Sequence, residues 1–86
     1  MMQLPLKGYT MKDLPEWEKK VQTLLKVEIL KRNLTYKQVS EKLAQIGVIE
    51  SEPNIRNKLA RGTFSAVFLV QCLEAIGSRS LQLLDG

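Results

Sequence analysis

Four polar residues in the predicted helix over 51–61 have the types and spacing needed to contact a nucleic acid. They are Asn54, Asn57, Lys58 and Arg61. Their positions, i, i+3, i+4 and i+7, share one side of an α-helix. Arginine and lysine reach phosphates or guanine edges, and asparagine can pair with adenine through two hydrogen bonds. Taken alone, the pattern also fits an ordinary solvated helix face.

The remaining residues of this segment can hold such a helix against a core. Ile55 and Leu59 lie on the side opposite the polar residues. Ser51 is suited to cap the helix, Pro53 is tolerated in its first turn, and Gly62 is suited to end it. We therefore expect a short helix that is anchored on one side and polar on the other.

A second group of polar residues lies at the start of the helix predicted before it. Thr35 can cap that helix, and Gln38 completes a capping box three residues later. Lys37 lies between them, and together with Ser51 these residues could hold phosphates near two helix N-termini. For Tyr36 two interpretations stay open: its hydroxyl contacts a phosphate, or its ring only packs.

The rest of the chain predicts helices and no strands. The apolar periodicity and the capping residues predict helices over 13–32, 35–46, 51–61 and 66–76, and a last short turn over 80–84. The predicted fold class is therefore all-α, a bundle of four to five short helices forming one domain over 13–86. Residues 1–12 carry Pro5 and Gly8 without an apolar period, which indicates an irregular arm.

The first predicted helix has an apolar face with one acidic residue inside it. The face comprises Trp17, Val21, Leu24, Leu25 and Ile29, of which Trp17 is expected to anchor the helix to the core. Glu28 falls within this face, and leaving a buried charge unpaired costs several kcal/mol, on the order of 3–5. We expect a cationic partner among Arg56, Lys58 and Arg61, with Arg61 favoured for its forked geometry.

The fourth predicted helix is apolar almost all round, so part of its surface is expected to meet a partner. Cys72, the single cysteine, is expected to pack as a small apolar group. We predict a weak homodimer, or as the alternative a cover formed by residues 1–15. The residues expected in the dimer contact are Phe68, Cys72 and Ala75, followed by Leu81, Leu83 and Leu84.

Composition argues against several functional classes. The chain has 86 residues, a net charge of +4 and no histidine, which removes His-based catalysis and the commonest ligand of catalytic metals. The glycines form no phosphate-binding loop, and the carboxylates are scattered. We therefore expect no enzyme, no cofactor and no metal site. One cysteine and the lack of a long apolar run predict a soluble cytoplasmic protein.

Two segments resemble the helix-turn-helix motif of lambda-repressor-like domains. TYKQVSEKLAQIG resembles the first helix of that motif, and SEPNIRNKLARG resembles the second, within a similarity that covers Trp17 to Leu84. The resemblance implies a helical bundle that binds double-stranded DNA through its second motif helix. Gly47 and Ile55 are eight residues apart, where that family has about six, so the turn is longer by about two residues.

A longer block, LLKVEILKRNLTYKQVSEKLAQIGVIESEPNIRNKLARGTFSAVFLVQCLEAIG, is more similar to a family of small bacterial domains of unknown function. Two hypotheses follow. The first is a small DNA-binding protein, a transcription regulator or an accessory to one. The second is a protein-interaction module that keeps the helix-turn-helix fold without binding DNA, because a fold alone does not decide its function.

Overall fold

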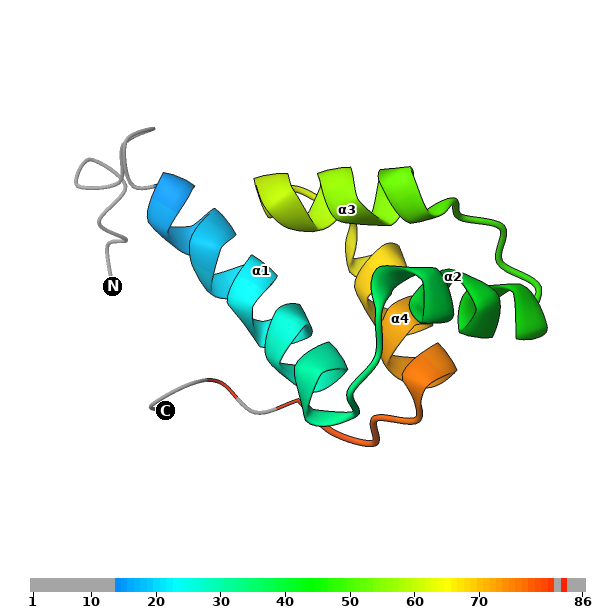
Figure 1. Ribbon diagram of the computed structural model, residues 1–86. Coiled ribbons are helices and arrows are strands. Elements are labelled where there is room, and N and C mark those ends of the chain that lie inside the picture. Colours follow the sequence, from blue (N-terminus) through cyan, green and yellow to red (C-terminus); the bar gives the residue numbers. More distant parts are fainter. Residues whose placement is uncertain (1–13, 82, 84–86) are drawn as a thin grey trace.

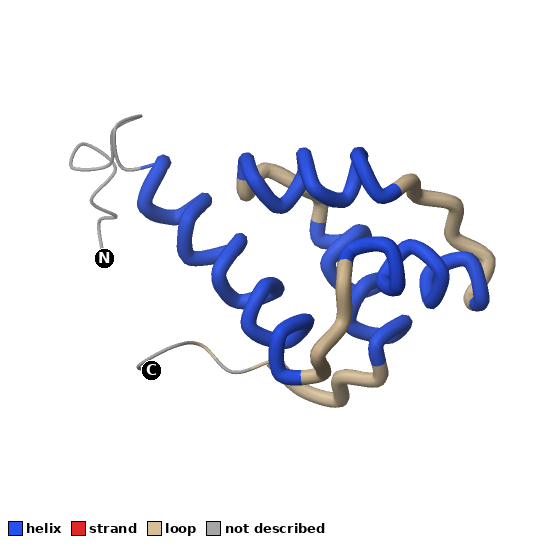
Figure 2. The backbone as a smooth tube through the Cα atoms, viewed as in Figure 1, coloured by secondary structure: helices blue, strands red, loops and turns tan. Residues whose placement is uncertain are grey.

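Four α-helices make up the described part of the chain, which in the computed structural model comprises residues 14–81 and 83 (Figure 1). They are α1 (Leu14–Lys31), α2 (Tyr36–Gln45), α3 (Glu52–Arg61) and α4 (Ala66–Ile76). No strand occurs among the described residues, as Figure 2 shows, which confirms the predicted all-α class. None of the described helices is long and apolar enough to cross a membrane.

Some predictions fall on the ends of the chain. The irregular arm over 1–12, the first residue of the helix predicted over 13–32 and Leu84 lie outside the described residues. The short turn predicted over 80–84 is not formed at 80, 81 or 83, which have no regular structure.

Local signals set the helix ends as predicted. The Thr35 hydroxyl accepts a hydrogen bond from the backbone N–H of Gln38 at 3.1 Å, and the Gln38 side chain accepts one from the backbone N–H of Thr35 at 2.8 Å. This reciprocal pair is the predicted capping box. Ser51 and Ser65 cap α3 and α4 through their side-chain oxygens. Asn33, with φ 54°, follows α1 in the left-handed conformation.

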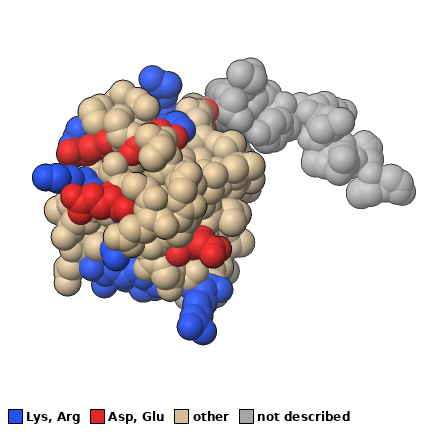
Figure 3. All heavy atoms as spheres, turned by 90° about the vertical axis from the view of Figure 1, so that its right-hand side faces the viewer, with Lys and Arg blue, Asp and Glu red and all other residues tan. Residues whose placement is uncertain are grey.

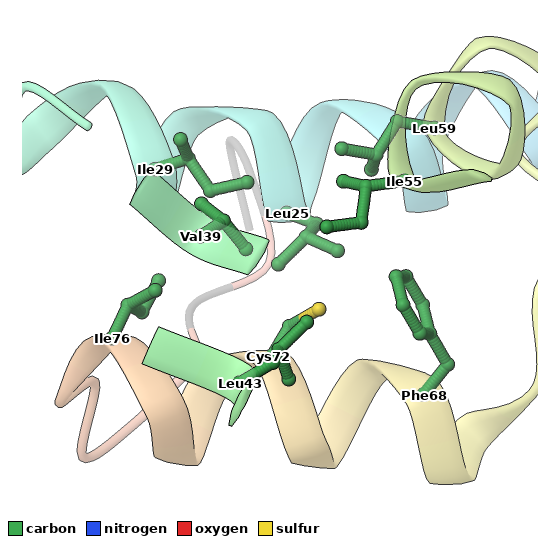
Figure 4. Packing of buried hydrophobic residues seen from close by; sticks show 9 residues of the cluster. All are labelled: Leu25, Ile29, Val39, Leu43, Ile55, Leu59, Phe68, Cys72 and Ile76. Carbon is green, nitrogen blue, oxygen red and sulfur yellow. The ribbon is translucent and has the colours of Figure 1, made fainter. Parts of the chain in front are cut away.

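All four helices contribute to one core, drawn in Figure 4. α2 packs against α3 and α4, and α1 packs against the same two helices. The cluster consists of Leu25, Ile29, Val39, Leu43, Ile55, Leu59, Phe68, Cys72 and Ile76. The helix that was predicted to carry the polar face is thus anchored by its two aliphatic residues, as expected.

Two predictions about apolar side chains were wrong. Trp17 is 54% exposed, with the Lys20 ammonium 5.4 Å from its ring centroid, so it does not anchor α1 to the core. Phe68 and Cys72 are buried inside the chain and are not available to a second copy. Because α4 is apolar almost all round, its sequence does not show which side faces the core. The exposed large apolar residues of α4 are Val67 and Val70.

The other residues predicted in the dimer contact differ in exposure. Ala75 and Leu81 are half-buried, and Leu83 is exposed. The prediction that Cys72 packs in the core is confirmed, because the side chain is fully buried. Burial raises the pKa of the Cys72 thiol to about 12, with a further contribution from the negative charge of Glu50. The thiol therefore stays protonated and behaves as a small apolar group.

Candidate nucleic-acid interface

The outer side of α3 presents three of the four predicted contact residues. Ile55 and Leu59 are fully buried, and Asn54, Asn57 and Arg61 are exposed. With 100° of rotation per residue, Asn57 lies almost opposite the direction in which the two aliphatic residues point. The helix therefore carries its amide and guanidinium groups on the side away from the core.

Lys58, the fourth predicted contact residue, is less exposed than Asn54, Asn57 and Arg61 and has partners within the chain. Its ammonium donates to the Glu50 carboxylate at 2.6 Å and lies 4.5 Å from the centroid of the Phe68 ring. The lysine thus joins α3 to the preceding turn and to the first residues of α4. Its charge is already paired with a carboxylate that is only 16% exposed, so its first role here is structural.

Hydrogen bonds from both sides order the turn between α2 and α3. The Ser40 hydroxyl donates to the backbone carbonyl of Glu50 at 2.7 Å, and the backbone N–H of Val48 donates to the carbonyl of Leu43 at 2.9 Å. Together with the ion pair from Lys58, these bonds fix the chain at both ends of the turn. The start of α3 therefore has a defined position relative to α2.

The same turn carries exposed apolar residues. Ile49 is 85% exposed and Ile46 is 44% exposed. Figure 3 faces the side of the molecule on which this turn lies, and the centre of that side is uncharged, with acidic and basic residues around it. An uncharged surface of this kind is less suited to phosphates than the outer side of α3.

The predicted residues at the start of α2 have different surroundings. Thr35 and Gln38 are exposed, but their side chains form the capping box. Lys37 is exposed beside them. Ser51, at the start of α3, accepts a bond from the N–H of Asn54 at 3.2 Å, and its hydroxyl can still donate. The Tyr36 ring is half-buried and packs against the core, which agrees with packing alone and equally with a hydroxyl that contacts a phosphate.

Arg56 also lies on this surface, although the sequence suggested it only as one of three possible partners of Glu28. The Arg56 guanidinium lies 5.9 Å from the centroid of the Tyr36 ring, and its Nη2 donates to the Glu52 carboxylate at 2.6 Å. It therefore lies where α3 meets the first turn of α2. Its place next to Asn57 in the sequence, flanking the outer side, was the signal that could have found it.

α1 holds the end of α3 through backbone contacts. The Gln22 side-chain amide donates to the backbone carbonyls of Leu59 and Ala60, two of the groups that a helix end leaves without partners. Gly62, with φ 68°, lies so close to α1 that a Cβ there would overlap the backbone carbonyl of Glu18. This packing fixes the end of α3 that carries Arg61.

Glu28 is buried and paired, as predicted, but its partners are not those expected. Its carboxylate accepts hydrogen bonds from Arg32 at 2.8 Å, from Lys31 at 3.3 Å and from the Ser78 hydroxyl at 3.1 Å. Arg61 is therefore not used for this pair. Burial acts to raise the pKa of Glu28, but the bonds from Arg32, Lys31 and Ser78 outweigh it and lower the pKa below its usual value.

Comparison with known families gives one match. A family model described as "Domain of unknown function (DUF6471)" matches residues 17–81, so the chain belongs to this family. That membership agrees with the closer of the two resemblances found in the sequence. No curated protein and no solved structure matches the chain.

Proposed function

We propose that this member of the DUF6471 family is a small DNA-binding protein, a transcription regulator or an accessory to one, in which α3 contacts duplex DNA. The observation that carries the proposal is the outer side of α3. Asn57 lies at its centre with Asn54, Arg61 and Arg56 around it, all exposed. Amides and guanidinium groups on an anchored helix are the combination that pairs with base edges and phosphates.

We further propose that α2 and α3 form a lambda-repressor-like helix-turn-helix motif. The order of the helices and their mutual packing support this assignment. The bonds from Ser40 and Lys58 to Glu50 support it too, because they give the longer turn a fixed geometry. In this arrangement Lys37 and Ser51 contact phosphates near the two helix N-termini, with Thr35 and Gln38 maintaining the first of these termini.

The test is a titration of mixed-sequence duplex DNA followed by fluorescence anisotropy at about 50 and 200 mM salt, since binding through phosphates weakens steeply over this range. Asn57→Ala provides the second arm. Alanine is the better helix former and Asn57 is exposed, so stability should stay within about 0.5 kcal/mol. Affinity for a preferred duplex, selected by the wild type from a randomised pool, should fall by about 1–3 kcal/mol.

Two outcomes would contradict the proposal. If the wild type fails to bind duplex at the lower salt concentration, α3 does not contact DNA. If it binds but Asn57→Ala discriminates between duplexes as well as the wild type does, Asn57 is not a base-contacting residue.

A second candidate function is favoured by the exposed apolar residues. Ile49 and Ile46 in the turn, with Val67 and Val70 on α4, are large apolar side chains at the surface. Such surfaces fit a module that binds another protein while keeping this fold. The absence of salt-dependent duplex binding would make this the better assignment.

A further inference from the structure

Arg56 is held from two sides at the junction of α2 and α3. Its guanidinium donates to the Glu52 carboxylate at 2.6 Å, and its Cζ lies 5.9 Å from the centroid of the Tyr36 ring. The Arg56 side chain is nevertheless 54% exposed. A guanidinium has five N–H donors, and the bond to Glu52 uses one, so the others remain able to contact a ligand.

The ion pair itself is weak, because the Glu52 side chain is 40% exposed as well. Water and salt screen such a pair, and side-chain entropy opposes it. A well-placed phosphate or guanine edge can therefore replace the carboxylate as the partner of Arg56. A poorly placed one cannot, and it also meets the negative charge of Glu52.

We propose that Glu52 restrains Arg56 so that the protein discriminates between a preferred duplex and random DNA. On random DNA the pair stays closed, and the negative charge of Glu52 weakens any contact between Arg56 and a phosphate. On a preferred duplex, contacts from the rest of α3 bring the groove close enough for Arg56 to exchange Glu52 for the nucleic acid. Glu52 is then a positioning residue that acts against the wrong partner. The inference rests on the proposed function of α3.

The test compares Glu52→Gln with the wild type on two duplexes, one selected by the wild type from a randomised pool and one of mixed sequence. We expect the variant to bind mixed-sequence duplex roughly 3–10-fold more tightly, with a salt slope steeper by about one unit because Arg56 now contacts a phosphate. Affinity for the selected duplex should change by less than about threefold. The ratio of the two affinities should therefore fall.

Two controls separate this mechanism from a simple change of net charge. Glu74→Gln removes the same charge from an exposed position on α4 and should leave the affinity ratio unchanged. In an Arg56→Ala background, Glu52→Gln should have no further effect on the ratio. If Glu52→Gln alters binding equally with and without Arg56, Glu52 acts only as a nearby negative charge and the inference is overturned.

The failures of the two proposals are distinguishable. A wild-type protein that binds no duplex overturns both. A wild type that binds in a salt-dependent manner, with Glu52→Gln leaving the ratio unchanged, overturns only the role of Glu52. Thermal unfolding followed by circular dichroism checks that each variant is folded, which the exposure of both side chains leads us to expect.

Discussion

α3 and α4 are built by the same local rules. Each begins at a capping serine, Ser51 or Ser65, whose side chain accepts a hydrogen bond from the third residue beyond it. Each ends at a left-handed glycine, Gly62 with φ 68° and Gly77 with φ 82°. Their lengths of 10 and 11 residues are nearly equal. From their ends alone, the two helices could not be assigned different roles.

Their outer sides differ in chemistry. α3 exposes Asn57 and Arg61, whereas α4 exposes Val67, Val70 and Glu74. Figure 4 shows the buried residues of α4, Phe68, Cys72 and Ile76, within the core. With 100° of rotation per residue, the exposed Val67 and Val70 lie on the opposite side of that helix. The bundle thus offers a polar, cationic surface on one side and an apolar one on another. Capping residues determine where a helix lies in the chain, and the residues between the caps determine what it can bind.

The largest expected effect concerns the ends of these two helices. Gly62→Ala combines a left-handed backbone with an overlap against the Glu18 carbonyl, whereas a Cβ at Gly77 meets nothing within 4 Å. We expect Gly62→Ala to lower the free energy of unfolding by about 2–5 kcal/mol and Gly77→Ala by about 1–2 kcal/mol. Urea unfolding of both variants measures the difference. Equal losses would mean that α1 does not approach α3 as closely as described.

Glu28 provides the next largest effect, because it links α1 to the segment after α4. Its folded pKa is lower than its unfolded pKa, so the carboxylate stabilises the fold above the unfolded value, and this contribution is lost as the pH falls through the folded value. Glu28→Gln should cost about 1–2 kcal/mol at pH 7, allowing for the exposure of Lys31 and Arg32. Urea unfolding at pH 7 and near pH 3 should show this difference shrinking in acid. A constant difference would exclude the linkage.

Lys58 and Arg61 test which cations of α3 belong to the polar surface. Lys58→Met removes the bond to Glu50 and should lower stability by about 1 kcal/mol, while changing the salt slope of duplex binding little. Arg61→Ala should leave stability within about 0.5 kcal/mol and reduce the salt slope by about one unit. Chemical unfolding and anisotropy titrations give both numbers. If Lys58→Met instead reduces the salt slope and leaves stability unchanged, Lys58 contacts a phosphate.

Features that depend on neighbours in the sequence were predictable. The capping box of Thr35 and Gln38, the cap at Ser51 and the glycine that ends α3 all form as expected. In each case the interacting groups lie within four residues of one another, so propensity and hydrogen bonding determine the outcome locally. The anchoring of α3 by its two aliphatic residues was also predictable, because its polar side has a clear period.

Features that depend on which helices become neighbours could not be predicted from the sequence. Lys31 and Arg32 lie three and four residues after Glu28 and were within reach of a local prediction, whereas only the tertiary fold brings Ser78 to Glu28 across 50 positions. Lys58 turns toward Glu50 because the long turn folds back beside α3. The proximity of Gly62 to Glu18, which positions the candidate surface, has no signature in the sequence except the glycine itself.

The smallest expected effect on stability belongs to the outer side of α4. Because Phe68 and Cys72 are buried, we now expect any dimer contact of α4 to involve the exposed Val67 and Val70. Val70 is 59% exposed, so Val70→Lys should change the free energy of unfolding by less than about 0.5 kcal/mol. If a second copy covers this side, the variant should lose the weak self-association that we predict, measured by sedimentation equilibrium up to high micromolar protein.

The control is Ile49→Lys, which adds the same charge on the turn and should retain the self-association. A wild type that stays monomeric would exclude the dimer, and loss of association in Ile49→Lys alone would move the contact to the turn. Since Val70 lies on the side of α4 opposite its buried residues, Val70→Lys should bind duplex DNA as the wild type does when both are monomeric, which would establish that the two surfaces act independently.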